Sequence, residues 1–144
     1  MSNIHLELVT PEGILVNEDI KELTAMTESG EIGILKNHAE LKSKLVSAPL
    51  KYKTLNDQID VVAVLGGVVE VSKNKITVLT DFAEKAEDID ETEAHKQAKK
   101  AEAEFQTLNK DAKVSDSKLM MAEMNLHKQA LRLEASRLKK NMLV

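Results

Sequence analysis

The first 80 residues alternate between apolar and polar positions with a period of two. Ile4, Leu6 and Leu8 alternate with His5 and Glu7, a pattern typical of a strand with one buried face. Turns rich in Gly, Pro, Asn and Asp separate the apolar runs at intervals of about 8–12 residues, so the pattern indicates a β-sandwich or barrel of about eight to ten short strands. The predicted strands are residues 4–8, 14–16, 20–26, 32–35, 45–46, 50–53, 59–65, 68–71 and 76–79.

The pattern changes to a helical one near residue 90. All five Gly and both Pro precede this point, and the residues after it are mostly Ala, Glu, Lys, Leu, Met and Gln, which favour helices. Asp90 is a good helix N-cap, and Glu93 follows three residues later, as in a capping box. The apolar residues recur at steps of three and four, so a first helix is predicted with the inward stripe Ala94, Ala98, Ala101, Phe105 and Leu108.

A second helix is predicted after the polar segment 109–115. Ser115 or Asp116 can cap it, and the pattern continues to about Asn141, with the inward stripe Leu119, Ala122, Leu126, Ala130 and Leu133. A connection this short implies two antiparallel helices. The predicted fold is therefore β + α: an N-terminal β-sandwich domain over residues 1–86, followed by a C-terminal antiparallel two-helix hairpin over residues 87–144.

The predicted hairpin combines an alanine seam with opposite charges. Residues 88–108 carry six acidic residues and three Lys, whereas residues 116–144 carry six Lys or Arg and three acidic residues, which favours antiparallel pairing. Three of the five inward positions on the first helix are Ala, and a buried methyl group contributes about 0.8 kcal/mol against ~1.5–3 for Leu. Two interpretations follow: a hairpin that detaches at modest cost, or one that stays docked.

Composition and charge exclude several classes of function. Aromatic residues make up 2% of the chain, with no Trp, and the formal net charge is −4, so neither stacking platforms nor a basic excess points to a nucleic-acid partner. Cysteine is absent, which excludes disulfides, zinc-thiolate sites and a thiol nucleophile. We expect no signal peptide and no membrane span, so membrane association is expected only through a partner.

The sequence offers no recognisable catalytic constellation. The four His (5, 38, 95 and 127) are far apart, without metal-ligand spacing, and no Ser lies in a nucleophile-elbow motif. Gly66-Gly67 lacks the phosphate-loop pattern and is interpreted as a bulge or a close backbone approach. His38 lies in a loop and is either structural or a partner contact, and the methionines of the second helix either pack the hairpin or dock it elsewhere. We predict no catalytic, metal or cofactor site.

Several stretches, taken in their order and spacing, resemble the epsilon subunit of F-type, proton-translocating ATP synthases of the bacterial type. The stretches are Val9–Gly13, Glu28–Leu35 with the following His38, Gly66–Val71, Asn74–Leu79 and Ala86–Asp90. Their order and spacing, with the hairpin that follows, extend along nearly all of the 144 residues. The resemblance implies a ten-stranded sandwich in a non-catalytic rotor subunit of the central stalk, peripheral to the cytoplasmic face of the bacterial plasma membrane.

The resemblance also implies partners and regulation. The sandwich is expected to bind the gamma subunit and to rest on the c-ring through Ser29, Gly30, Glu31 and His38. The hairpin is expected to inhibit ATP hydrolysis when it extends, meeting the alpha and beta subunits and gamma. Its second helix carries the cations suited to acidic loops there, which are Lys128, Arg132, Arg137, Lys139 and Lys140. The alternative is a stand-alone adaptor module of similar shape, without a role in ATP synthesis.

Two segments depart from the family pattern. Lys36 and Asn37 precede His38, where family members usually have Pro and a small or basic residue. Some bacterial members bind ATP through an I/L-D-x-x-R-A motif, whose counterparts here are Ile89, Asp90, Glu93 and Ala94. Glu93 replaces the arginine, and a carboxylate repels phosphate where a guanidinium would bind it, so we hypothesise weak or no ATP binding.

Overall fold

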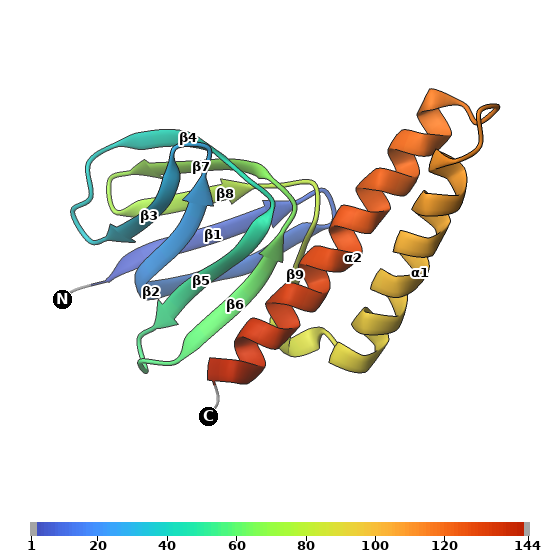
Figure 1. The fold of residues 1–144 in the computed structure, drawn as a ribbon. Helices are drawn as coiled ribbons and strands as arrows, with labels where there is room; N and C mark the ends of the chain where they lie inside the picture. The colour runs from blue at the N-terminus through green and yellow to red at the C-terminus, as the bar shows by residue number, and fades with distance from the viewer. Residues whose placement is uncertain (1–2, 143–144) are drawn as a thin grey trace.

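The computed structural model describes residues 3–142, and within that range nine strands precede two α-helices (Figure 1). The elements are β1 (Ile4–Thr10), β2 (Gly13–Thr27), β3 (Gly30–Leu35), β4 (Leu41–Leu45), β5 (Ala48–Thr54), β6 (Ile59–Val64), β7 (Gly67–Ser72), β8 (Lys75–Leu79), β9 (Ala83–Lys85), the 3₁₀ turn η1 (Ala86–Asp88), α1 (Glu91–Asn109) and α2 (Asp116–Met142).

The strands form one sheet that curls around a single core. Their order is β1-β8-β7-β4-β2-β5-β6-β9, with β3 paired to β2. Strand β2 pairs with β1 through its first half and with β3 and β5 through its second half. Strand β1 also pairs with β8. The long strand β2 therefore joins the two layers of a β-sandwich. The predicted fold class, a sandwich followed by a helical hairpin, is confirmed.

The core consists of the inward-facing residues of the predicted strands. Ile4, Leu6 and Leu8 are buried as the alternation predicted, and Leu23 and Ile34 meet them from β2 and β3. Tyr52 is also buried, and its hydroxyl donates to a Glu18 carboxylate oxygen at 3.2 Å. Burial raises the pKa of Tyr52, so the phenol stays neutral.

Three details of the strand prediction differ from the structure. The predicted strand 45–46 shares only Leu45 with β4, because β4 ends at that residue. The segments 14–16 and 20–26 belong to one strand, β2, because polar Asn17 and Asp19 remain extended opposite β1 and accept hydrogen bonds from His5 at 2.6 and 2.8 Å. Strand β9 was not predicted, since three residues are too short to show a period. The resemblance implied ten strands, and residues 3–142 contain nine.

Both predicted helix starts are confirmed. The Asp90 carboxylate accepts a hydrogen bond from the Glu93 backbone N–H at 3.1 Å, and the Ser115 hydroxyl oxygen accepts one from the Lys118 backbone N–H, also at 3.1 Å. The Glu93 side chain does not complete the predicted capping box. Its carboxylate instead accepts from the Gln97 amide at 2.9 Å, one turn further along α1.

Helix α2 lies between the sheet and α1, so the hairpin forms a layer beside the sandwich (Figure 1). Helix α1 packs on α2, whereas α2 also contacts β6, β5 and η1. The predicted seam therefore describes one face of α2. The residues that α2 buries most completely are on a second face, which the sequence analysis did not identify: Leu131, Ala135 and Ser136.

Candidate functional site

A small apolar cluster joins the hairpin to the sandwich. Strand β6 is buried on both faces: Val62 and Val64 point into the sandwich core, whereas Val61 and Ala63 point outward beneath α2. The other buried members of this docking cluster are Ala86, Ile89, Ala94, Leu131 and Ala135. Four of the seven are alanine, so close approach is achieved with little apolar area.

Arg132 of α2 forms a forked ion pair with Glu84 of β9. Arg132 Nε lies 2.7 Å from Glu84 Oε1, and Nη2 lies 3.4 Å from Oε2. The two side chains retain 19% and 27% of their exposure. Gln129, one turn earlier on α2, accepts a further hydrogen bond from Arg132 Nη1 at 2.9 Å. The guanidinium is thus held in one orientation by three bonds.

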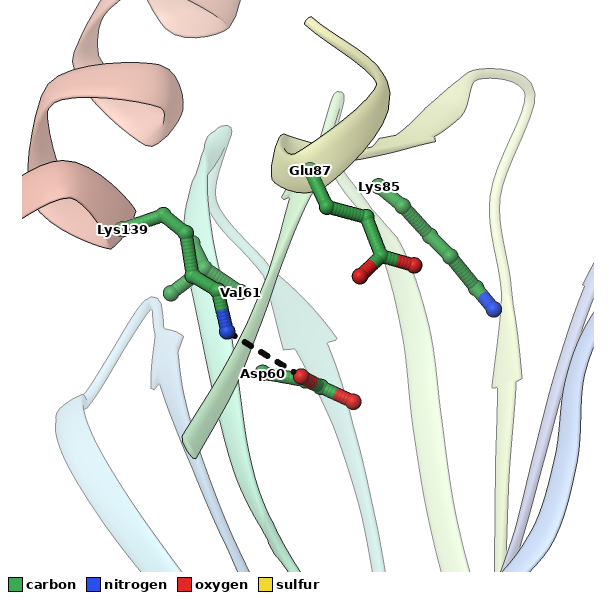
Figure 2. A pocket seen from close by; sticks show the side chains of 5 residues that line it. All are labelled: Asp60, Val61, Lys85, Glu87 and Lys139. Atoms are coloured by element: carbon green, nitrogen blue, oxygen red, sulfur yellow. Dashed lines mark hydrogen bonds and ion pairs between the residues drawn. The ribbon is translucent and has the colours of Figure 1, made fainter. Parts of the chain in front are cut away.

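Lys139, near the end of α2, reaches the edge of the sandwich at β6 (Figure 2). Its ammonium donates to the Ile59 carbonyl at 2.6 Å and to the Asp60 carboxylate at 3.2 Å. At the opposite end of the docked face, Lys128 Nζ lies 4.2 Å from the centre of the Phe82 ring. Three cations of α2 therefore face the sandwich, and each has a specific partner there.

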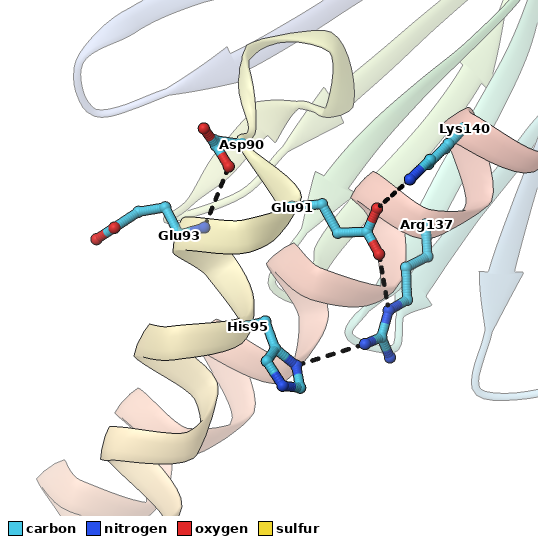
Figure 3. A network of polar contacts seen from close by, with 6 residues as sticks. All are labelled: Asp90, Glu91, Glu93, His95, Arg137 and Lys140. Atoms are coloured by element: carbon cyan, nitrogen blue, oxygen red, sulfur yellow. Dashed lines mark hydrogen bonds and ion pairs between the residues drawn. The ribbon is translucent and has the colours of Figure 1, made fainter.

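A second polar network ties the two helices together where they meet the sandwich (Figure 3). Glu91, the first residue of α1, accepts from Arg137 at 3.3 Å and from Lys140 at 3.2 Å. The Lys140 hydrogen bond, with a smaller contribution from Arg137, lowers the pKa of Glu91. Arg137 also donates to His95 Nδ1 at 3.4 Å. His95 is half-buried in this network.

The residues predicted to meet the c-ring and gamma do not form a single cluster. Ser29 lies in the turn between β2 and β3, and Gly30 and Glu31 are the first residues of β3; the Thr27 hydroxyl donates to the Gly30 carbonyl at 2.8 Å. His38 follows the other end of β3, and a six-residue strand spans roughly 20 Å. The half-buried His38 ring donates to the Ala39 carbonyl at 2.7 Å.

The four residues of the predicted vestigial ATP motif have structural roles. Ile89 and Ala94 belong to the docking cluster, with 7% and 0% of their area exposed. Asp90 caps α1, and Glu93 is exposed and accepts from Gln97. The motif therefore places the hairpin against the sandwich.

Gly67 confirms the predicted close backbone approach. A Cβ atom there would collide with the Leu79 carbonyl on β8, and the backbone has φ +118°, which side chains rarely adopt. Among residues 3–142 no group of three His, Asp or Glu side chains converges as a metal site. None of the helices in that part of the chain is long and apolar enough to cross a bilayer.

The sequence analysis missed the acidic partners on the sandwich, Asp60 and Glu84. Each is a single polar residue in a short strand, and no pattern in the neighbouring sequence marks it as a partner of the second helix. The docked face of α2 could have been found, because Lys128, Arg132, Ala135 and Lys139 recur at steps of four, three and four. That stripe was passed over because it is more basic than apolar.

The sequence profile of the family described as "ATP synthase, Delta/Epsilon chain, beta-sandwich domain" matches residues 3–86. The chain is 37% identical to the chloroplastic ATP synthase epsilon chain of Medicago sativa over 123 residues, which cover 85% of each chain. It is 42% identical over 100 residues to the ATP synthase epsilon chain of Nitratidesulfovibrio vulgaris (strain DP4), covering 69% of this chain and 74% of that one.

Two solved structures share the fold. A chain of the Euglena gracilis mitochondrial ATP synthase (OSCP/F1/c-ring in rotational state 1) superposes with a TM-score of 0.73 at 22% identity, covering 94% of this chain and 81% of that one. A chain of the Tetrahymena thermophila mitochondrial ATP synthase (central stalk/c-ring) gives a TM-score of 0.58 at 18% identity, with coverage of 92% and 95%.

Proposed function

The chain belongs to the delta/epsilon chain family of ATP synthases, and from this membership we propose that it is a rotor subunit of the central stalk. It is a non-catalytic subunit, which couples proton flow through the c-ring to ATP synthesis elsewhere in the complex. The observation that carries this proposal is the likeness to an epsilon chain over 85% of the sequence, which includes part of the hairpin as well as the sandwich.

The sandwich, residues 1–86, is the proposed assembly domain. Its partners are the gamma subunit and the c-ring, through the turn at Ser29, Gly30 and Glu31 and the loop at His38. Their separation along β3 supports two contacts rather than one, so that one end of β3 meets the c-ring and the other end meets gamma. Exposed Leu35, with 53% of its area accessible, lies between them and adds apolar surface.

The hairpin, residues 87–144, is the proposed regulatory domain. In its extended form it inhibits ATP hydrolysis as it lies along gamma, and its cations meet acidic loops of the beta subunits. These cations are Lys128, Arg132, Arg137, Lys139 and Lys140. The small docking cluster supports this role, because alanine-rich contacts leave a modest barrier to detachment. Exposed Met120, Met121 and Met124 near the hairpin turn supply an adaptable apolar surface for the extended form.

The proposed location is the cytoplasmic face of a bacterial plasma membrane, where the protein is held peripherally by its complex. The identity of 42% to a Nitratidesulfovibrio vulgaris chain supports a bacterial setting.

The decisive experiment compares ATP hydrolysis by the assembled catalytic complex with the full chain and with a chain truncated after residue 86. We expect both forms to co-purify with gamma and the truncated form to release hydrolysis from inhibition. Equal hydrolysis with both forms contradicts the inhibitory role. Failure of the full chain to co-purify with gamma contradicts the rotor assignment and favours a stand-alone adaptor.

We further propose that ATP does not set the position of this hairpin. Glu93 occupies the position of the phosphate-binding arginine, and Ile89 and Ala94 are already packed in the docking cluster. Calorimetric titration of the full chain with ATP is expected to give no saturable heat, and a micromolar affinity contradicts the proposal.

A further inference from the structure

The face of α2 that meets the sandwich is unusually basic for a docked helix. Lys128, Arg132, Ala135 and Lys139 lie in one line, because steps of four, three and four follow the 3.6-residue helical repeat. Leu131 and Leu138 flank this line and pack with the docking cluster. The apolar part of the contact is therefore narrow, and charged groups lie along its centre.

Two of these charges, Arg132 and Lys139, have a carboxylate partner on the sandwich at hydrogen-bonding distance. Arg132 meets Glu84 on β9, and Lys139 meets Asp60 on β6. The four side chains keep between 17% and 30% of their exposure, so the pairs are largely withdrawn from water. Removing one partner from such a pair leaves the other charge uncompensated, which costs more than breaking a pair on an open surface.

The two pairs fix the position of α2 more specifically than the apolar contact does. Alanine and valine surfaces tolerate sliding, because apolar contact is not directional. A guanidinium fork on a carboxylate accepts one geometry. Arg132 and Lys139 are seven residues apart, which is about 10 Å along a helix. The two pairs therefore fix both the position of α2 along its axis and its rotation about that axis.

The remaining cations of α2 are also engaged within the chain. Glu91 of α1 binds both Arg137 and Lys140. All five cations proposed to meet an acidic partner are therefore occupied in the docked hairpin, including Lys128 above the Phe82 ring. An acidic partner can reach them only after the contacts within the chain have broken.

We propose that the Arg132–Glu84 and Lys139–Asp60 pairs form an ionic clamp, which holds α2 on the sandwich and withholds its cations from acidic partners. The hairpin then leaves the sandwich by exchanging Glu84 and Asp60 for carboxylates of the partner. The clamp itself is a property of the isolated chain, and its regulatory consequence rests on the proposed function. It predicts that docking weakens with ionic strength, since salt screens partly exposed pairs.

The clamp can be tested on the full chain, because the protein contains no Cys and two can be introduced as labelling sites. Exposed Glu12, on the sandwich, and exposed Met124, on α2, are replaced by Cys and spin-labelled. Pulsed EPR then measures the distance distribution at about 50 mM and about 500 mM salt. We expect one short distance at low salt and a second, broad population at high salt.

The neutral variants Glu84→Gln and Asp60→Asn are expected to raise the ratio of detached to docked chain by about tenfold or more at low salt. The matched control is Asp57→Asn, which removes an equally short pair with Lys21 (2.6 Å) from an exposed turn of the sandwich. This control is expected to leave the distance distribution unchanged. Distributions that match the unsubstituted chain for both Glu84→Gln and Asp60→Asn overturn the proposal.

A charge exchange separates the ion pair from general packing. Glu84→Arg combined with Arg132→Glu is expected to restore the docked distance that Glu84→Gln loses, and failure to restore it contradicts the clamp. ATP hydrolysis by the assembled complex then tests the regulatory consequence. If Glu84→Gln detaches the hairpin without deepening inhibition, the clamp stands and the inhibitory function fails. If the hairpin stays docked, the clamp fails whatever the rate of hydrolysis.

Discussion

The sandwich core and the docking cluster bury different kinds of side chain. Among the described residues, one of the seventeen core members is alanine, whereas four of the seven docking members are. Full burial of a Leu, Ile or Val side chain contributes about 1.5–3 kcal/mol, against about 0.8 for a methyl group. The sandwich is therefore stabilised mainly by the apolar area that it buries. The docked hairpin buries less apolar area and depends in addition on ion pairs.

Because of this difference, we expect the sandwich to keep its structure under conditions in which the hairpin changes its position. Apolar packing of the core responds little to salt or to an acidic protein nearby. The Arg132–Glu84 and Lys139–Asp60 pairs respond to both, because other carboxylates or ions can replace their partners. One short chain thus contains a fixed domain for assembly and a domain whose position depends on its surroundings.

The same substitution in the two regions is expected to give different losses. Leu23→Ala, in the core, should lower the free energy of unfolding by about 2–5 kcal/mol, because it leaves a cavity among rigid neighbours. Leu131→Ala, in the docking cluster, can lower the free energy of unfolding by no more than the free energy of docking. Once the hairpin has detached, the substitution has no further effect on the sandwich. Denaturant unfolding monitored on the sandwich measures both losses.

Hydrogen exchange of the backbone amides measures the effect of each substitution on the sandwich and on the hairpin separately. Leu131→Ala should accelerate exchange of the α2 amides while the β1 amides keep their protection, whereas Leu23→Ala should accelerate exchange of the β1 amides. Equal effects of Leu131→Ala on α2 and β1 would mean that hairpin and sandwich unfold as one unit, and the proposed division into two domains would be wrong.

A smaller effect is expected at the start of the hairpin. Asp90→Ala removes the hydrogen bond that caps α1, at a cost of about 1 kcal/mol. The loss should appear as faster exchange in the first turns of α1. Glu104→Ala, at an exposed position in the middle of the same helix, is the control. Similar exchange rates in the two variants would assign the stability of this helix end to packing at Ala94.

The sequence predicted the parts of this molecule that local chemistry determines. Alternation identified the strands that bury Ile4, Leu6 and Leu8, and short polar side chains identified Asp90 and Ser115 as helix caps. These features depend on residues close together in the chain. The boundaries were less accurate, because extended Asn17 and Asp19 depend on a distant partner, His5.

The contacts between hairpin and sandwich could not be predicted in the same way. Arg132 and Glu84 are 48 residues apart, and Lys139 and Asp60 are 79 apart, so no local pattern relates them. The sequence analysis matched the cations of α2 to the acidic first helix and, through the family resemblance, to an outside partner. It did not identify Glu84 and Asp60 as further partners on the sandwich. The predicted inward stripe was correct for α1, where Ala94 and Ala101 are buried. It described one face of α2, which has a second buried face at Leu131 and Ala135.

The smallest expected effects are pH responses of opposite sign in the two regions. In the sandwich, hydrogen bonds to Asp19 and then Asn17 raise the pKa of His5 above its ordinary value of 6.5. Its contribution to stability is present below that value and is lost as pH rises through the raised pKa. In the hairpin, the Lys140 hydrogen bond lowers the pKa of Glu91 below its ordinary value of 4.5. That contribution is present above this value and is lost as pH falls through the lowered pKa.

Two substitutions isolate these contributions. Asp19→Asn should return the His5 pKa, followed by NMR, toward its ordinary value and should flatten the dependence of sandwich stability on pH above 6.5. Glu91→Gln should remove the acid-side change in the separation between labels on α1 and on the last turn of α2. Both effects should be small, because the groups are partly exposed and solvent screens them. An acid-side change that persists in Glu91→Gln would contradict the assignment of this response to Glu91.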